Sequence, residues 1–342
     1  MIITVSNRNV AVDAHSRDPV IGDHTIFGDR ENQEGGWDEL RVATAELRGD
    51  DWRVTLYPDT PGPDFSTRTE ELFAGTLARI RNGDLPGNWV VFIHGFNQSF
   101  VKNLKKCKEI EDYGVNVLAF SWPSNPGPNG GFFSAAGNKI KEYQRARANA
   151  NHSLVAADRF MEKIVRYVRG GVDESCGQSL TLLVHSLGNY LFQRTVEDSL
   201  FTDDLGIFDN ILLHQADADN DDHDRWVDRL GDAKRIYVTI NERDSVLQVS
   251  SLVNGRRLGN TPHNLMATLP TYVDFSFGDW VFNEHRLFRP EMRRNNPVIG
   301  QFFARALNGR PAETISGLTF NGANGAYQLS DRPGEQEEWE TP

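Results

Sequence analysis

The chain contains little cysteine, with only Cys107 and Cys176 in 342 residues. Two thiols are too few for a disulfide scaffold, and their spacing matches no metal site. Long apolar runs are also absent, since the longest, residues 89–93 and 180–184, are far too short to cross a bilayer. The first ten residues lack the basic and apolar segments of a signal peptide. We therefore expect a cytoplasmic protein without stable membrane association.

Positive charge is scarce as well. The 36 lysines and arginines are outnumbered by 48 aspartates and glutamates, which gives a formal net charge of −12. Such a chain repels nucleic acid unless its cations gather in a patch. The nearest approach to a patch, the four lysines within residues 102–108, shares a predicted helix with Glu109 and Glu111. We interpret these lysines as a solvated helix face and expect no nucleic-acid partner.

Short, continuous apolar runs recur along the chain, and most are followed by a stretch with helical spacing. Continuous rather than alternating apolar residues are typical of strands buried on both faces of a parallel sheet. Alternating strands and helices place helices on both sides of that sheet. The pattern predicts an α/β fold with a mostly parallel central sheet of about eight strands. The runs are residues 89–93, 115–120, 180–184, 211–213, 235–240 and 272–277.

One domain accounts for most of the chain. We predict that residues 1–310 form a single α/β domain, in which residues 1–88 supply N-terminal strands and an irregular excursion. Residues 122–150, which include Phe132 and Phe133, form a possible lid or acyl-binding wall, although these phenylalanines could equally anchor a loop. Residues 311–342 are expected to be a partly disordered C-terminal extension.

Ser186 stands between the apolar run 180–184 and a helical stretch, with Gly188 two residues later. A serine in this position occupies a tight strand-to-helix turn that lifts its hydroxyl clear of the backbone. The helix behind it favours developing negative charge. The common pattern is Gly-x-Ser-x-Gly, and Val184 replaces the first glycine. We predict that Ser186 is a nucleophile on such an elbow; an ordinary helix N-cap is the alternative.

A serine hydroxyl becomes a good nucleophile when a histidine accepts its proton and a carboxylate orients that histidine. Hydrolases with such an elbow place the three residues in the order serine, acid, histidine. Asp244 follows the run 235–240, and His285 follows the last run. We predict Asp244 as the acid and His285 as the base, with Asp217 as the alternative acid and His263 as the alternative base.

Two backbone amides, those of Leu187 and Phe96, are predicted to form an oxyanion hole. Leu187 follows the nucleophile, and Phe96 belongs to the loop after the first long apolar run. A glycine at position 95 lets that loop approach closely. The predicted pocket residues are His94, Gly95, Asn97, His185, Trp122, Phe132 and Phe133.

The acidic run at residues 217–224 is a candidate cation loop. Asp222 occupies its sixth position, where an EF-hand requires glycine. A solvated acidic loop is therefore the favoured interpretation, although cation binding stays open. We expect no metal and no cofactor.

Taken together, these residues resemble the α/β-hydrolase superfamily, and more narrowly a bacterial family of α/β hydrolases of unknown function often labelled as esterase/lipase-superfamily proteins. The resemblance extends from near the N-terminus to about Leu307. It implies the fold and hydrolase chemistry but no particular substrate, and it supports Asp244 as the acid. The segments that carry it are residues 5–8, 27–28, 92–97, 120–124, 143, 146–153, 185–189, 244–247, 250, 257–259 and 285–288.

The sequence thus predicts a serine hydrolase that cleaves a carboxylic ester or thioester through an acyl-enzyme on Ser186. An acyltransferase with the same triad and a non-catalytic binding module on a hydrolase scaffold are the alternatives. The expected partner is a small-molecule acyl substrate, and the oligomeric state is left open.

Overall fold

The computed structural model describes residues 1–12, 18–31, 36–58, 67–125, 136–171, 178–198 and 202–330. The predicted pocket residues Phe132 and Phe133 lie outside these ranges, as does Cys176. Of the segment 122–150, the structure describes residues 122–125 and 136–150. Cys107 is described and is buried as a free thiol.

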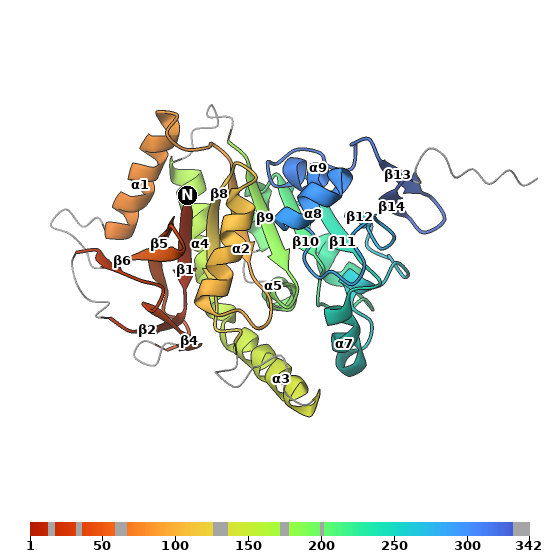
Figure 1. Cartoon of the computed structure of the whole chain (residues 1–342), viewed down its shortest axis with the longest axis horizontal. Helices are drawn as coiled ribbons and strands as arrows, with labels where there is room; N and C mark the ends of the chain where they lie inside the picture. The colour runs from red at the N-terminus through yellow and green to blue at the C-terminus, as the bar shows by residue number, and fades with distance from the viewer. Residues whose placement is uncertain are drawn as a thin grey trace, which may run out of the picture.

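A twelve-stranded sheet forms the centre of the molecule (Figure 1). Eight of its strands are adjacent and parallel, which confirms the predicted fold class. In spatial order these are β1 (Ile2–Ser6), β8 (Asn116–Ser121), β7 (Trp89–Ile93), β9 (Leu180–His185), β10 (Asn210–His214), β11 (Ile236–Ile240), β12 (Thr271–Asp274) and β14 (Ala326–Leu329).

Antiparallel strands extend the sheet at both edges, so it is larger than predicted. Beyond β1 lie β5 (Arg41–Arg48), β6 (Asp51–Tyr57) and β3 (Val20–Gly22), and beyond β14 lies β13 (Leu318–Asn321). A separate small sheet pairs β2 (Arg8–Val10) with β4 (Phe27–Glu31). The predicted boundary at residue 310 therefore does not separate the C-terminal residues from the sheet. Their short, partly exposed strands carry no continuous apolar run.

Helices cover both faces of the sheet. On one face lie α1 (Arg68–Arg81), α3 (Ala136–His152), α4 (Leu154–Gly171), α5 (Gly188–Glu197) and α6 (Asp224–Val227). On the other face lie α2 (Phe100–Glu111), α8 (Pro290–Asn295) and α9 (Pro297–Ala306).

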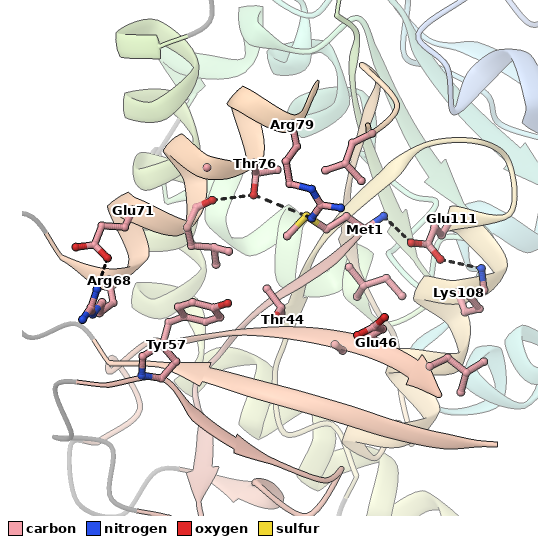
Figure 2. Close-up of a pocket in the computed structure, with 17 residues that line it drawn as sticks. Met1, Thr44, Glu46, Tyr57, Arg68, Glu71, Thr76, Arg79, Lys108 and Glu111 are labelled. Atoms are coloured by element: carbon pink, nitrogen blue, oxygen red, sulfur yellow. Dashed lines mark hydrogen bonds and ion pairs between the residues drawn. The ribbon is translucent and has the colours of Figure 1, made fainter. Parts of the chain in front are cut away.

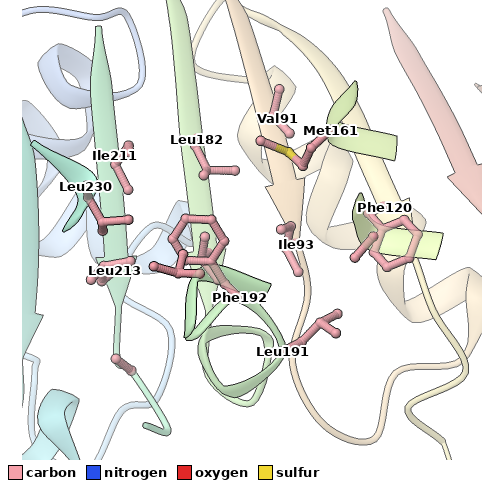
Figure 3. Close-up of a cluster of buried hydrophobic side chains, with 14 of the residues drawn as sticks. Val91, Ile93, Phe120, Met161, Leu182, Leu191, Phe192, Ile211, Leu213 and Leu230 are labelled. Carbon is pink, nitrogen blue, oxygen red and sulfur yellow. The ribbon is translucent and has the colours of Figure 1, made fainter. Parts of the chain in front are cut away.

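Strand β7 explains why its sequence is continuously apolar. Val91 and Ile93 belong to the core cluster beneath α4 and α5, part of which is shown in Figure 3. Val90 and Phe92 point to the opposite cluster, beneath α2 and α9. Because successive side chains of a strand alternate between faces, both faces must be apolar when both are covered.

Side-chain caps define where helices begin near the strand ends. Ser99 accepts a hydrogen bond from the Lys102 amide at the start of α2, and Thr67 forms a capping box with Glu70 at the start of α1. The cap at Ser99 ends the loop that follows β7, which fixes the length of that loop.

The carboxyl ends of the parallel strands meet at one edge, from which α3 and α7 (Ser245–Asn254) project (Figure 1). The two helices are joined by a hydrogen bond from the Asn254 amide to the Tyr143 hydroxyl, 3.2 Å, and by a contact between Arg147 and Asn254. Among the helices of the described ranges, none has the length and apolar character to cross a membrane.

Candidate active site

Ser186 occupies the turn between β9 and α5 with a φ of 56°. A non-glycine residue in this left-handed region is strained, and such strain is concentrated at functional sites. Hydrogen bonds hold the turn in place: the Ser186 amide donates to the His214 carbonyl, 3.1 Å, and the Asp217 amide donates to the Ser186 carbonyl, 3.2 Å. The Asn189 side chain donates to the Ser186 carbonyl, 3.1 Å. Neighbouring strands therefore maintain the strained turn.

Two glycines allow the turn to pack against the end of β7. A Cβ atom on Gly95 would lie 2.5 Å from the Ser186 Cβ, and one on Gly188 would lie 2.8 Å from the His94 carbonyl oxygen. Neither distance is sterically possible, so these positions need glycine. Val184, which stands where the common pattern has glycine, is instead fully buried in the core of the sheet.

The carboxylate of Asp244 contacts the imidazole of His285. The distance from Asp244 Oδ2 to His285 Nδ1 is 2.6 Å, and Asp244 is fully buried. The other oxygen, Oδ1, accepts the amides of Val246 and Leu247 at 2.9 and 3.1 Å, so Asp244 is also the N-cap of α7. Capping fixes the plane of the carboxylate that faces His285.

Three buried polar side chains hold the backbone around His285. The His185 Nε2 donates to the His285 carbonyl, 3.1 Å, and the Asn241 amide donates to the Glu284 carbonyl, 2.9 Å. The Leu287 amide donates to His214 Nε2, 3.2 Å. Burial holds the pKa of His185 and that of His214 well below the usual histidine range. Both rings are therefore neutral supports of the His285 segment.

His94 supports the loop after β7 in the same way. Its Nε2 accepts the Trp122 amide, 3.2 Å, so Nδ1 carries the proton and donates to the Gly95 carbonyl, 3.0 Å. The His94 and Trp122 rings stack with centroids 5.5 Å apart, and burial lowers the pKa of His94. His94 and Trp122, which were predicted as pocket residues, thus have fully buried side chains behind the loop. Gly95, predicted as a third, packs against the Ser186 turn, and none of the three is in the cavity lining.

A cavity of about 840 Å³ opens beside Ser186 at the carboxyl ends of the strands. Its lining includes Ser186, His285, and the predicted pocket residues Asn97 and His185. One part of the lining is apolar and comes mainly from α3 and α7, whereas another part, the α2 wall, is charged and comes from α2 and Arg286. The wall residues are Phe96, Ile140, Val246, Val249 and Val253 on the apolar side, and Lys102, Lys105, Lys106, Glu109 and Arg286 on the charged side.

Asp217, the alternative acid, has other partners than His285. Its carboxylate accepts the hydroxyls of Ser250, 2.6 Å, and Tyr143, 3.0 Å, and forms an ion pair with Arg257 Nε, 2.9 Å. Arg257 is fully buried and also pairs with Asp219 at 2.5 Å. His263, the alternative base, is exposed on a loop outside the cavity lining.

The acidic run at residues 217–224 is therefore partly neutralised by Arg257. Within the described ranges, no group of three or more histidine, cysteine, aspartate or glutamate side chains is arranged to hold a metal ion.

Helix α2 corrects one interpretation from the sequence. Lys102 and Lys105 are exposed, as expected of a solvated face, but Lys106 is only 6% exposed and lines the cavity. The sequence analysis did not connect Lys106 or Arg286 with the site. The spacing of residues 102, 105, 106 and 109 does place them on one helix face, but it does not show what that face contacts.

A second cavity, of about 700 Å³, lies between α1, β5 and α2, away from Ser186 (Figure 2). Glu46, Glu71 and Glu111 line it together with Arg68, Arg79 and Lys108. Arg68 pairs with Glu71 at 2.5 Å, and Lys108 pairs with Glu111 at 2.8 Å. Acidic and basic side chains are therefore balanced in this cavity, unlike those of the α2 wall beside Ser186.

Comparison with known proteins identifies the family of this chain. Residues 78–266, more than half of the chain, match the family described as alpha/beta hydrolase of unknown function (DUF900). The match includes Ser186 and Asp244 and ends before His285. No curated protein and no solved structure matches the chain significantly. The chain belongs to the DUF900 family of alpha/beta hydrolases, as the resemblance in its sequence predicted.

Proposed function

We propose that the protein is a serine hydrolase that cleaves a carboxylic ester or thioester. The observation that carries this proposal is the 2.6 Å contact between Asp244 and His285, a histidine that lines the same cavity as the strained Ser186. A carboxylate bound to Nδ1 keeps the proton on that nitrogen and leaves Nε2 free to accept the serine proton.

In the proposed reaction, Ser186 Oγ attacks the acyl carbon and His285 Nε2 takes the hydroxyl proton. The C–O or C–S bond to the leaving group then breaks, and the leaving group receives that proton from His285. Water, deprotonated by His285, attacks the acyl-enzyme and releases the carboxylic acid and Ser186. Every step uses groups of this chain and water, so the proposal includes no cofactor.

The amides of Leu187 and Phe96 are the proposed oxyanion hole. In the part of the chain that the structure describes, neither amide donates to a protein acceptor. Leu187 precedes the first turn of α5, whose N-terminal end favours negative charge. Two unused donors beside the nucleophile are what a developing oxyanion requires.

A fluorophosphonate probe tests this function, because it forms a covalent adduct only with an activated serine. We expect one adduct by intact mass on the wild-type protein and none on Ser186→Ala. As a matched control, Ser250→Ala removes another serine of the same cavity and should keep the adduct. A folded wild-type protein without an adduct would reject the hydrolase and favour a non-catalytic binding module.

Product analysis then separates the hydrolase from an acyltransferase. With an aryl ester and added glycerol or glycine as competing acceptors, a hydrolase releases the free acid, whereas a transferase forms a new ester or amide.

The cytoplasmic location stays a prediction.

A further inference from the structure

The α2 wall of the active-site cavity carries an excess of positive charge in a protein whose net charge is −12. It holds Lys102, Lys105 and Lys106 from α2, together with Arg286, which follows the predicted base. The carboxylate on this wall is Glu109, whose Oε1 lies 3.0 Å from Arg286. An acidic surface repels anions, so a local excess of cations reverses that repulsion at this wall.

Lys106 is the most informative residue of this wall. Its side chain is over nine-tenths buried, and within the described ranges it has neither a hydrogen-bond acceptor nor a carboxylate at ion-pair distance. Burial, reinforced by the positive charge of Arg286, lowers the pKa of Lys106 to about 7. An ammonium with so little access to water is unfavourable without a counterion, so an anion bound in the cavity would stabilise the charged form of Lys106.

Arg286 also has a buried nitrogen that lacks a hydrogen-bond partner within the described ranges. Its Nε is buried without a hydrogen-bond partner among the described residues, although its guanidinium pairs with Glu109. The charge of Lys106 also contributes, after burial, to the low pKa of His185, whose ring lines the cavity. Lys106 lines the same cavity as Ser186 and His285, so it is not at a remote surface.

The apolar wall of the cavity, formed mainly by α7, has different chemistry. Val246, Val249 and Val253 of α7 are all at least 40% exposed although they are apolar, and they line the cavity together with Ile140 of α3. Glu142 is the charged residue on the α3 side. A ligand that satisfies both walls has an apolar part against α7 and an anionic part against α2.

We propose that the substrate is an acyl ester or thioester that carries an anionic group, a carboxylate or phosphate, held by Lys106 and Arg286 while its apolar part lies against α7. This inference rests on the proposed hydrolase function and narrows its substrate class. Lys106 acts as a specificity determinant through direct contact with the anionic group.

Matched ester pairs test the proposal. The first pair is 4-butyryloxybenzoate and 4-butyryloxybenzamide, which differ in charge on the alcohol side. The second pair is monophenyl adipate and phenyl adipamate, which differ on the acyl side. A fifth ester, 4-butyryloxyphenyl phosphate, offers a phosphate. We expect kcat/KM to favour an anionic ester over its neutral counterpart by about tenfold or more.

Variants assign that preference to the wall. In Lys106→Met the anion-to-neutral ratio of kcat/KM should fall to within about threefold of one, and Lys106→Arg should restore it. The double variant Lys102→Met/Lys105→Met changes two exposed side chains and should lower the same ratio, which gives a second test should Lys106→Met unfold. Lys141→Met removes an exposed lysine next to, but outside, the cavity lining and should leave the ratio unchanged.

The outcomes separate this inference from the proposed function. Equal kcat/KM for all anionic and neutral esters, or a preference that survives in Lys106→Met and in the double variant, overturns the anionic substrate. If none of the five esters is hydrolysed, the hydrolase proposal fails, and calorimetric binding of the same compounds to Ser186→Ala still tests the wall. Tighter binding of the anions, lost in Ser186→Ala/Lys106→Met, would support the inference, and equal binding would reject it.

Discussion

Two buried aspartates follow neighbouring strands at the same edge of the sheet, and their surroundings differ. Asp244, after β11, gives one oxygen to the amides of α7 and the other to His285. Asp217, after β10, is bound by two hydroxyls and by the buried guanidinium of Arg257. A carboxylate that is paired with a permanently charged arginine stabilises the fold. A carboxylate whose partner is a histidine can stabilise a charge that appears only during a reaction.

The largest effect expected from this contrast is on activity. Asp244→Asn should lower kcat by about 10⁴, because the amide no longer holds His285 in the tautomer that accepts the serine proton. Asp217→Asn should lower kcat by less than about tenfold, since its carboxylate does not contact His285. Steady-state kinetics with an activated ester measures both variants. The reverse ranking would make Asp217 the acid.

Stability should rank the two aspartates in the opposite order. Asp217→Asn removes the buried one of the two carboxylates that pair with Arg257 and leaves the half-exposed Asp219, so it should cost up to about 3–5 kcal/mol in the free energy of unfolding. Asp244→Asn should cost about 1 kcal/mol or less from the cap, because asparagine is itself a good N-cap. Urea unfolding of the two variants at pH 7.5 gives the comparison. Equal losses would show that both carboxylates are mainly structural.

Acid should weaken the His285 segment and the loop after β7, because both are held by neutral, buried histidines. His94, His185 and His214 have folded-state pKa values below the unfolded value of about 6.5. Their contribution to stability is therefore complete above pH 6.5. It is lost as the pH falls, because the unfolded chain then binds more protons. Each histidine contributes a slope of at most about 1.4 kcal/mol per pH unit.

Unfolding measured from pH 7.5 to 5 checks this prediction. The slope should decrease in a His214→Asn variant. It should be unchanged in His263→Asn, which alters an exposed histidine on a loop. A wild-type stability that does not fall below pH 6.5 would contradict the neutral state of the buried rings.

The Asp217 network also includes Tyr143, which links α3 to Asp217 and to Asn254 of α7. Tyr143→Phe removes the hydroxyl and should cost about 1–3 kcal/mol in unfolding free energy. In Asp217→Asn the same change should cost less, because the two residues share one network. A double-mutant cycle measures this coupling, and strict additivity would show that the hydroxyl does not contribute through Asp217.

The sequence was sufficient to predict which polar residues follow the ends of the strands. Ser186, Asp244 and His285 follow apolar runs, and the carboxyl ends of parallel strands meet at one edge, so it could be expected that they lie close together. Their catalytic roles stay predictions. The burial of Lys106 could not be read from the sequence, since helical spacing defines a face but not its neighbour. His94 and Trp122 were predicted to line the pocket but are buried behind the loop. The sequence could not show this, because residues just after a strand can pack on either side of the loop.

The dual role of Asp244 has a mechanical consequence. The residue that orients His285 is also the first cap of α7, and the exposed valines of α7 form the apolar wall of the cavity. A shift of α7 would therefore reach the carboxylate through the two amides that bind it. A molecule that contacts the valines could therefore change the position of His285, because α7 and Asp244 connect the two. A molecule that fits the cavity poorly would thus displace α7 and misalign His285, the proposed base.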